Sequence, residues 1–289
     1  MQKLQSGLVI EFYSNSCLVR TDIGDIKCLA IKNIVVGDKV SIELIQDSKE
    51  AKGIIVSREQ RNSFLEKRNG IKSKAVAANI SHVGILITPE PITSTEFIDK
   101  WLLTAHSSGI TPFIINNKID LNQNSDYKKK LKIYEDLGLK IIAISAKKDY
   151  ELLELNSFLE SKCVIFVGNS GAGKSTLTTK LTGRDIRTNA LSNNQGMHTT
   201  SISTLYELNK DTKIIDSPGV RDLPISGLTE AEIIQGFSEI YSSSKACKFN
   251  DCNHIANDGC MVLSKLMDGD INESRYNNFI KFRDGELDE

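Results

Sequence analysis

One segment, GNSGAGKS at residues 168–175, constrains the fold of this chain more than any other. It has the spacing Gly168, four residues, then Gly173, Lys174 and Ser175, and it lies between the apolar run CVIFV and the helix-like segment KSTLTTKLTG. A glycine-rich loop between a strand and a helix lets backbone N–H groups surround a phosphate, and the positive end of the helix attracts the anion further. The segment therefore predicts a phosphate-binding loop in an α/β domain.

The side chains of this loop have separate expected roles. Lys174 is expected to reach the β and γ phosphates of a nucleoside triphosphate, and the Ser175 hydroxyl to bind Mg²⁺. The residues expected to contact the nucleotide here are Gly168, Asn169, Ser170, Gly171, Ala172, Gly173, Lys174, Ser175 and Thr176.

A second motif, Asn117-Lys118-Ile119-Asp120, indicates which base is bound. The Asp120 carboxylate can accept from the N1–H and the exocyclic amine of guanine, whereas adenine would leave it buried and unpaired, at a large energetic cost. Asn117 would tie neighbouring loops together, and the stem of Lys118 would lie over the base. Taken alone, these four residues could equally be a polar loop that caps the next helix.

The segment ISAK, residues 144–147, favours guanine over that alternative. It follows the apolar run KIIA, as a base-binding loop after a parallel strand would. Ser145 and Ala146 can complete the base pocket, with the Ala146 N–H available to guanine O6. The expected nucleotide is therefore GTP, with GDP after hydrolysis.

Two further segments carry features of nucleotide-sensing switches. In GMHTTS, residues 196–201, Thr199 and Thr200 could each coordinate Mg²⁺ and sense the γ-phosphate; we assign the metal contact to Thr200, and the choice between the two stays open. In TKIIDSPG, Asp216 ends an apolar strand and can hold Mg²⁺ directly or through water, while the Gly219 N–H can approach the γ-phosphate.

The order of these motifs differs from that of ordinary GTPases, which begin with the phosphate loop and end with the base loops. Here the base loops come first, followed by the phosphate loop, the threonine segment and the Asp-Ser-Pro-Gly segment. The same sheet closes if the ordinary order is rotated, which predicts a circularly permuted P-loop GTPase core. Because Asp216 then leads directly into the C-terminal part, we hypothesise that loss of the γ-phosphate is reported to that part.

The catalytic machinery departs from the usual design at one position. Val220 follows Pro218-Gly219, where Ras-like enzymes soon place a glutamine that orients water. His198 is the best local substitute, since its ring can donate to or accept from water. The alternative is a structural or merely exposed loop histidine. We expect intrinsic hydrolysis to be slow and to depend on a partner.

A cluster near the C-terminus has the composition of a metal site. Its four residues are Cys247, Cys252, His254 and Cys260. Three thiolates and an imidazole fill a tetrahedral Zn²⁺ site and leave no position for a substrate, so a structural zinc is predicted, one that staples a small domain. The other cysteines, Cys17, Cys28 and Cys163, lie in apolar strand-like runs and are expected to be buried thiols.

Periodicity and composition divide the chain into four parts. Five short β-rich runs predict an OB-type β-barrel over 1–57, and alternating strands and helices place the permuted GTPase domain at 79–224. Residues 225–289 are expected to form a helical zinc-binding domain. Between barrel and core, residues 58–78 are a basic linker, either a solvated face or an RNA-contacting segment.

Charge and hydropathy limit the partners. A net charge of −1 argues against nucleic-acid binding through the overall field, so RNA contacts would have to be local. Since no run is long and apolar enough to cross a bilayer and the first residues lack the pattern of a signal peptide, we expect a cytoplasmic protein with no membrane contact. We also expect a monomer.

Together, the barrel, the rotated motif order and the cysteine cluster resemble the ribosome small-subunit-dependent GTPase A family. GMHTTS is similar to the Gly-x-His-Thr-Thr pattern of that family, and AANISHV and CKFNDCNH resemble two more of its segments. The resemblance implies that barrel and zinc domain contact ribosomal RNA and protein, that the small ribosomal subunit stimulates GTP hydrolysis, and that the protein acts late in maturation of that subunit. It also places the catalytic histidine at His198.

Two other functions remain open at this point. One is a nucleotide-regulated RNA-binding scaffold in which hydrolysis is incidental. The other is a P-loop kinase acting on a small substrate, which the base loop and the two extra domains make less attractive. Acceleration of GTP turnover by ribosomal subunits separates the first function from the scaffold, and transfer of phosphate to an acceptor other than water would indicate the kinase.

Overall fold

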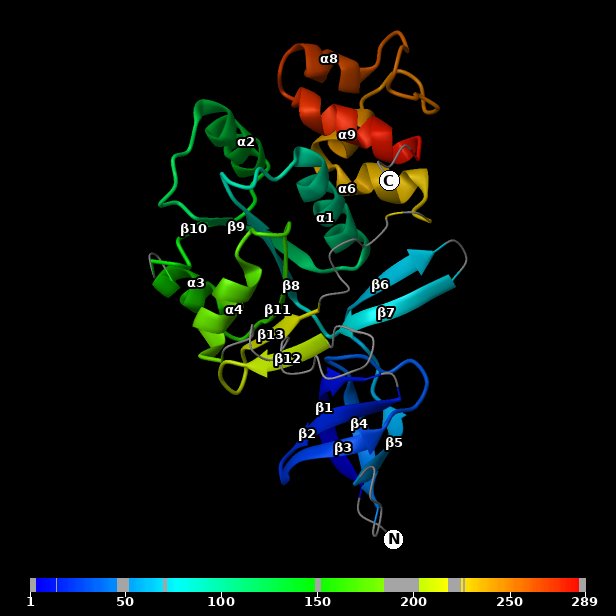
Figure 1. Cartoon of the computed structure of the whole chain (residues 1–289). Helices are drawn as coiled ribbons and strands as arrows, with labels where there is room; N and C mark the ends of the chain where they lie inside the picture. Colours follow the sequence, from blue (N-terminus) through cyan, green and yellow to red (C-terminus); the bar gives the residue numbers. More distant parts are fainter. Residues whose placement is uncertain are drawn as a thin grey trace.

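The structure is a computed structural model, and it describes residues 4–13, 15–45, 52–69, 72–148, 152–184, 203–217, 225 and 227–285. Figure 1 shows a central α/β core with a β-barrel at one end and a group of helices at the other. Among the helices described, none is long and apolar enough to cross a membrane.

The N-terminal barrel has five strands: β1 (Gln5–Phe12), β2 (Ser16–Thr21), β3 (Gly24–Leu29), β4 (Lys39–Leu44) and β5 (Gly53–Arg58). Their order is β1-β2-β3-β5-β4, and β4 pairs back with β1, which closes the barrel. Alternate residues point inward, as in β3, where Ile26 and Cys28 are buried between exposed neighbours. This agrees with the OB-type barrel expected from the sequence.

A β-hairpin occupies the stretch that the sequence analysis treated as a linker. Strands β6 (Phe64–Asn69) and β7 (Lys72–Ala78) pair antiparallel, with Phe64 opposite Ala78. Its many basic residues hid the strand pattern, because alternation of apolar and polar residues is the usual signal for a strand.

The core contains the strands β8 (His82–Ile87), β9 (Thr111–Asn117), β10 (Ile141–Ile144), β11 (Cys163–Val167), β12 (Ser203–Glu207) and β13 (Lys213–Asp216). Its order is β10-β9-β8-β11-β13-β12, parallel except for β12. The carboxyl ends of the parallel strands meet at one edge of the sheet, which we call the nucleotide edge. In α/β sheets this is where ligands bind.

Helices cover both faces of the core sheet (Figure 1). The helices are α1 (Thr95–Ser107), α2 (Ser125–Asp136), α3 (Leu152–Leu159) and α4 (Lys174–Thr182). Successive residues of β8 separate the two apolar cores, since Ile85 packs with Trp101 of α1 and Leu86 packs with Leu155 of α3. This is the arrangement expected for strands buried on both faces.

A helical domain follows the core: α6 (Glu230–Gly236), α7 (Ser238–Ser244), α8 (Met261–Met267) and α9 (Glu273–Arg283). It packs on α1 of the core through a buried ionic network. Arg275 Nη1 lies 2.8 Å from Asp99 Oδ1 of α1, and Asn278 Nδ2 donates to Asp99 Oδ2 at 2.6 Å. Tyr134 of α2 donates to the same carboxylate, and Arg275 also binds Glu239 of α7.

The barrel joins the rest of the chain through a different set of contacts. Asp38, fully buried, accepts from Arg61 Nε at 2.7 Å and from Arg61 Nη2 at 2.8 Å. Asn79 donates to the carbonyl of Gly37 at 2.8 Å. Gly37 packs so closely on the Ala78 carbonyl that a Cβ atom there would lie 2.1 Å from its oxygen.

Candidate nucleotide and metal sites

The phosphate loop lies between β11 and α4 at the nucleotide edge, where the sequence placed it. Its glycines adopt backbone angles that favour glycine, with φ of +80° at Gly171 and +95° at Gly173. A Cβ atom at Gly173 would lie 2.4 Å from Asn117 Nδ2, so this position requires the absence of a side chain. The loop is therefore built against the base loop itself.

Asn117 joins three loops that are far apart in the sequence. Its Nδ2 donates to the carbonyl of Ala172 in the phosphate loop at 2.9 Å, and its Oδ1 accepts from the Ala146 N–H at 3.1 Å. The side chain is almost fully buried. The base loop, the ISAK loop and the phosphate loop thus meet at one amide group.

Lys174 begins α4, and its ammonium turns back onto the loop that precedes it. Its Nζ donates to the carbonyls of Gly168 and Asn169, the second at 3.0 Å. Ser175 and Thr176 follow in the first turn of α4, and Ser175 is exposed to solvent. A charged group and a hydroxyl therefore stand together where the N–H groups of the helix point outward.

Asp120 and Ser145 form a pair at the nucleotide edge. Ser145 Oγ donates to Asp120 Oδ1 at 2.6 Å, and Lys148 Nζ lies 3.6 Å from Asp120 Oδ2. The hydrogen bond from Ser145 is the main cause that holds the pKa of Asp120 below its ordinary value. The carboxylate is therefore kept in its charged, accepting form.

Lys118 is positioned by a contact that the sequence did not indicate. It has a φ of +63°, and its Nζ donates to the carbonyl of Glu90 at 2.7 Å. Glu90 lies in the loop between β8 and α1, and Pro91 of that loop packs 3.5 Å from the Cβ position of Gly171. A backbone carbonyl carries no sequence signal, so this wall of the site could not be found from motifs.

Asp216 ends β13 at the nucleotide edge, beside the phosphate-loop strand β11, with which β13 pairs in parallel. The next residue, Ser217, is buried, and its hydroxyl lies 2.7 Å from the hydroxyl of Ser203. The expected switch residues His198, Thr199, Thr200 and Gly219 lie outside the described residues.

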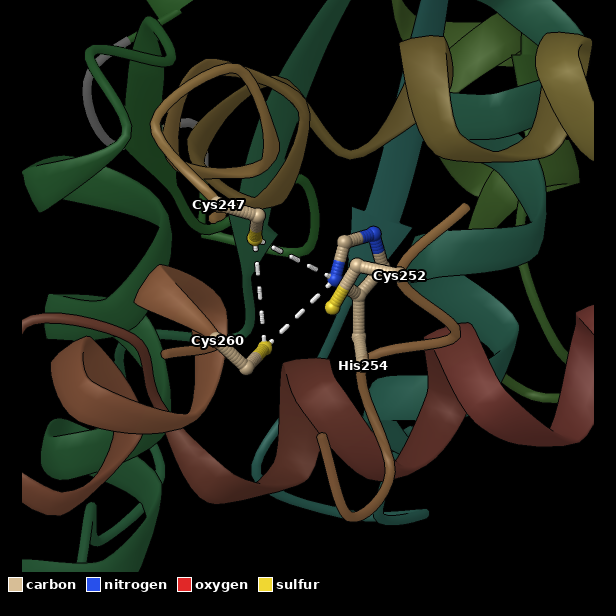
Figure 2. Close-up of side chains that lie close together, drawn as sticks. All are labelled: Cys247, Cys252, His254 and Cys260. Carbon is tan, nitrogen blue, oxygen red and sulfur yellow. Dashed lines mark hydrogen bonds between the residues drawn. The ribbon is translucent and has the colours of Figure 1, made fainter. Parts of the chain in front are cut away.

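Figure 2 shows the four predicted zinc ligands turned toward one another. Their ligand atoms all lie within 4.8 Å of one another. His254 Nδ1 is 3.7 Å from Cys247 Sγ and 3.6 Å from Cys260 Sγ, and the two sulfurs are 4.0 Å apart. A tetrahedron with metal–sulfur bonds of about 2.3 Å has edges of about 3.8 Å, so the residues fit a zinc ion.

The surroundings of His254 also suit a metal ligand. Burial lowers its pKa, so the ring is kept in the neutral form that binds metals. The hydroxyl of Tyr276 donates to the His254 carbonyl at 2.7 Å, and Arg283 Nη1 donates to the Asn253 carbonyl at 2.6 Å. Two side chains of α9 thus hold the ligand loop in place.

Comparison with known proteins identifies the family. The model of the RsgA GTPase family matches residues 58–226, more than half of the chain. This chain belongs to the RsgA GTPase family. Like other members of that family, it is a GTP hydrolase, it binds guanine nucleotide, and Mg²⁺ accompanies the nucleotide.

Curated RsgA relatives cover most of the chain. A protein of Chromohalobacter salexigens named small ribosomal subunit biogenesis GTPase RsgA is 35% identical, over 88% of this chain and 76% of its own length. A relative with the same name from Haemophilus influenzae is 34% identical, over 95% of this chain and 83% of its own length.

Two solved structures share the RsgA fold seen here. YjeQ from Thermotoga maritima is 29% identical, with a TM-score of 0.76 over 99% of this chain and 100% of that one. YloQ, described as a circularly permuted GTPase, is 23% identical with a TM-score of 0.71, over 98% of this chain and 95% of that one. The rotated motif order predicted from the sequence is therefore confirmed as a circular permutation.

Proposed function

We propose that this GTPase acts on the small ribosomal subunit late in its maturation, and that the subunit accelerates its GTP hydrolysis. The observation that carries the proposal is the meeting of three nucleotide-binding loops at Asn117. The names of the curated relatives, which describe biogenesis of the small ribosomal subunit, supply the partner.

Guanine is recognised by the Asp120 carboxylate, which Ser145 orients and keeps charged. One of its oxygens accepts from the N1–H and the other from the exocyclic amine. The Ala146 N–H donates to Asn117 Oδ1 in this structure, so guanine O6 would have to replace or share that acceptor for the N–H to complete the pocket. Lys118 spans the space between the base loop and Glu90. Adenine would leave the carboxylate without donors.

Phosphate is bound by the backbone of residues 168–173 and by the ammonium of Lys174. A phosphate oxygen can replace the loop carbonyls as the acceptor for that ammonium, which already lies against the loop. Ser175, Thr200 and Asp216 would hold Mg²⁺, since hydroxyl and carboxylate oxygens are the ligands that this cation prefers. The ion would neutralise negative charge that develops on the phosphates.

His198 orients the attacking water in place of the glutamine that Val220 does not provide. A histidine on a switch segment acts only when the segment is brought against the γ-phosphate, and contact with the subunit would stabilise that arrangement. Hydrolysis is then slow in isolation and fast on the subunit. The zinc ligands play no part in this chemistry, because a site with four protein ligands leaves no open position.

The first test is GTP turnover with and without purified small ribosomal subunits, for the wild type, His198→Ala and the matched control His106→Ala. His106 is an exposed histidine at the end of α1. We expect strong stimulation of wild type and control, and loss of stimulation in His198→Ala with subunit binding retained. If wild type binds the subunit in a GTP-dependent way without any acceleration, the scaffold function replaces this one.

The second test addresses base recognition by Asp120. In Asp120→Asn the amide can donate to the C2 carbonyl of xanthine but repels the amine of guanine, so preference should move from GTP to XTP. Asp126→Asn, at an exposed position on α2, serves as control. An Asp120→Asn variant that kept its preference for GTP would remove Asp120 from the base pocket.

A further inference from the structure

Two hydroxyl groups link β12, which follows the first expected switch segment, to the end of β13, where the second begins. Ser203 begins β12 three residues after Thr200, and Ser217 directly follows Asp216 at the end of β13. The strands pair antiparallel with Thr204 opposite Asp216, and the two serine Oγ atoms are 2.7 Å apart. The link lies one residue beyond that pair, at the nucleotide edge, where β12 begins and β13 ends.

The burial of this pair makes it more than a surface contact. The exposed fraction of Ser217 is 7%, and Ser203 is half-buried. A buried hydroxyl without a hydrogen-bond partner is destabilising, because it has lost its bonds to water and gained none in return. The hydrogen bond between the two serines is therefore favoured over their separation. Any movement that separates β12 from the end of β13 must break this bond.

The other edge of β12 belongs to the barrel. Glu11 of β1 lies opposite Thr204, and Phe12 opposite Ser203, so barrel and core form one continuous sheet of 11 strands. Arg20 of β2 reaches across to Glu207 at the far end of β12, with Nη1 2.6 Å from Oε2. Ser203 therefore has the barrel on one side and the Asp216 strand on the other.

We propose that Ser203 and Ser217 are positioning residues for GTP hydrolysis, and that β12 couples the barrel to the nucleotide edge. Their bond fixes the end of β13, and with it Asp216, against the start of β12. Through the β1 pairing, a ligand that moves the barrel also moves Ser203 and changes this position. The proposal rests on the assignment of Asp216 to Mg²⁺ made above.

The first experiment measures basal GTP turnover and its Mg²⁺ dependence, without ribosomal subunits, for Ser203→Ala, Ser217→Ala and Ser203→Thr. The matched control is Ser243→Ala, which removes a buried hydroxyl that donates to Glu239 within α7, remote from the nucleotide edge. For each alanine variant at the pair we expect kcat to fall about fivefold, the effect of one hydrogen bond.

The accompanying changes separate positioning from stability. In the alanine variants, KM for GTP should change less than about twofold, and the Mg²⁺ concentration that gives the half-maximal rate should rise. Ser203→Thr should keep the wild-type rate because it keeps the hydroxyl. Rates equal to that of Ser243→Ala would overturn the role of the pair. Asp216→Asn shows which claim fails if the serine variants have no effect. If Asp216→Asn leaves the Mg²⁺ dependence of turnover unchanged, the assignment of Asp216 to Mg²⁺ is wrong. If Asp216→Asn abolishes turnover while the serine variants behave as the control, only the role of the serine pair is wrong.

The second experiment tests the barrel side by amide hydrogen exchange with GDP and with a non-hydrolysable GTP analogue. Exchange of residues 8–12 in β1 should differ between the two nucleotides, whereas β5, on the far side of the barrel, should change less. Arg20→Ala should reduce the difference, while Glu154→Ala, which breaks the remote Lys140–Glu154 pair, should not. Equal exchange of β1 in both nucleotide states would exclude coupling through β12.

Discussion

The barrel and the helical domain flank the same core but are attached to it by different physical means. The barrel shares backbone hydrogen bonds with the core, because β1 pairs with β12, and the side-chain amide of Asn79 adds a bond to the carbonyl of Gly37. Among the described residues, the helical domain is bonded to α1 through side chains, chiefly in the network around Asp99 and Arg275. A backbone joint runs beside the strands that lead to the nucleotide, whereas a side-chain network between helices does not.

This difference changes the expectation about signalling. The sequence led to the hypothesis that loss of the γ-phosphate is reported to the C-terminal part, because that part follows Asp216 in the chain. The helical domain, however, is held on α1 by a carboxylate that accepts from Arg275, Asn278 and Tyr134. Such a buried network favours one fixed arrangement, so the barrel is the better placed of the two domains to respond to nucleotide.

The largest effect is expected from removal of zinc. Chelation, or Cys260→Ser, should unfold the helical domain and leave the barrel and core folded, because binding of a structural zinc contributes on the order of 10 kcal/mol to folding. Amide exchange resolved along the chain and zinc content are the measurements. The control variant Cys163→Ser should bind as much zinc as wild type. If α6–α9 stayed protected from amide exchange after complete loss of zinc, the metal would not be what stabilises this domain.

The side-chain joint can be broken at Arg275. Arg275→Met leaves Asp99 buried without its ionic partner, and we expect a loss of about 3–5 kcal/mol in the free energy of unfolding. Chemical denaturation measures it, with the exposed Lys132–Asp136 pair as a control: Lys132→Ala should cost less than about 0.5 kcal/mol. If the network serves only to pack the helical domain on α1, the rate of GTP hydrolysis per folded Arg275→Met molecule stays equal to that of wild type. A changed rate would support the hypothesis that the helical domain responds to nucleotide.

The barrel joint should respond to Arg61 more weakly than the helical joint responds to Arg275. Arg61→Ala removes both charged hydrogen bonds to the buried Asp38, at a cost of about 2 kcal/mol, and should raise exchange in β4 and at residues 33–38. Arg58→Ala is the matched control, since Arg58 lies 3.8 Å from the same carboxylate and is one third exposed. Equal effects of the two substitutions would show that the bidentate geometry is unimportant.

A change confined to the base pocket should affect neither joint and should have the smallest effect on stability. Ser145→Ala removes the hydrogen bond that lowers the pKa of Asp120, so that pKa rises toward its ordinary value of about 4. Because guanine binding needs the charged carboxylate, GDP affinity of the variant should fall at a higher pH than that of wild type as the solution is acidified. Affinity measured from neutral pH downward tests this, and coinciding pH profiles would contradict it.

The parts of the molecule that follow from local pattern were predictable. Five short strands, the strand–loop–helix around Lys174 and the Cys247–Cys260 cluster each carry their signal within a short stretch of sequence. The rotated order of the motifs was enough to predict the permuted core. For the expected zinc ligands, residue type and spacing alone indicated four side chains that the fold brings together.

Contacts between distant segments were not predictable in the same way. Asp99 sits among apolar residues of α1 and looks like a solvent-facing position until α9 covers it. The pairing of Phe12 with Ser203 joins residues that no local periodicity relates. Glu90 contributes only its carbonyl. In each case the contact depends on a residue far away in the sequence, and a single sequence does not show which distant residues come together.

The strand pairing between barrel and core also dictates an order of events when the chain is made. Synthesis proceeds from the N-terminus, so the barrel can close through β1 and β4 long before β12 leaves the ribosome that is translating it. One end of β1, at Glu11 and Phe12, keeps its edge exposed until Ser203 and Thr204 have emerged. A newly made barrel therefore carries an unpaired edge for most of translation, which makes this edge the place where a chaperone or a wrong strand would compete with the native partner.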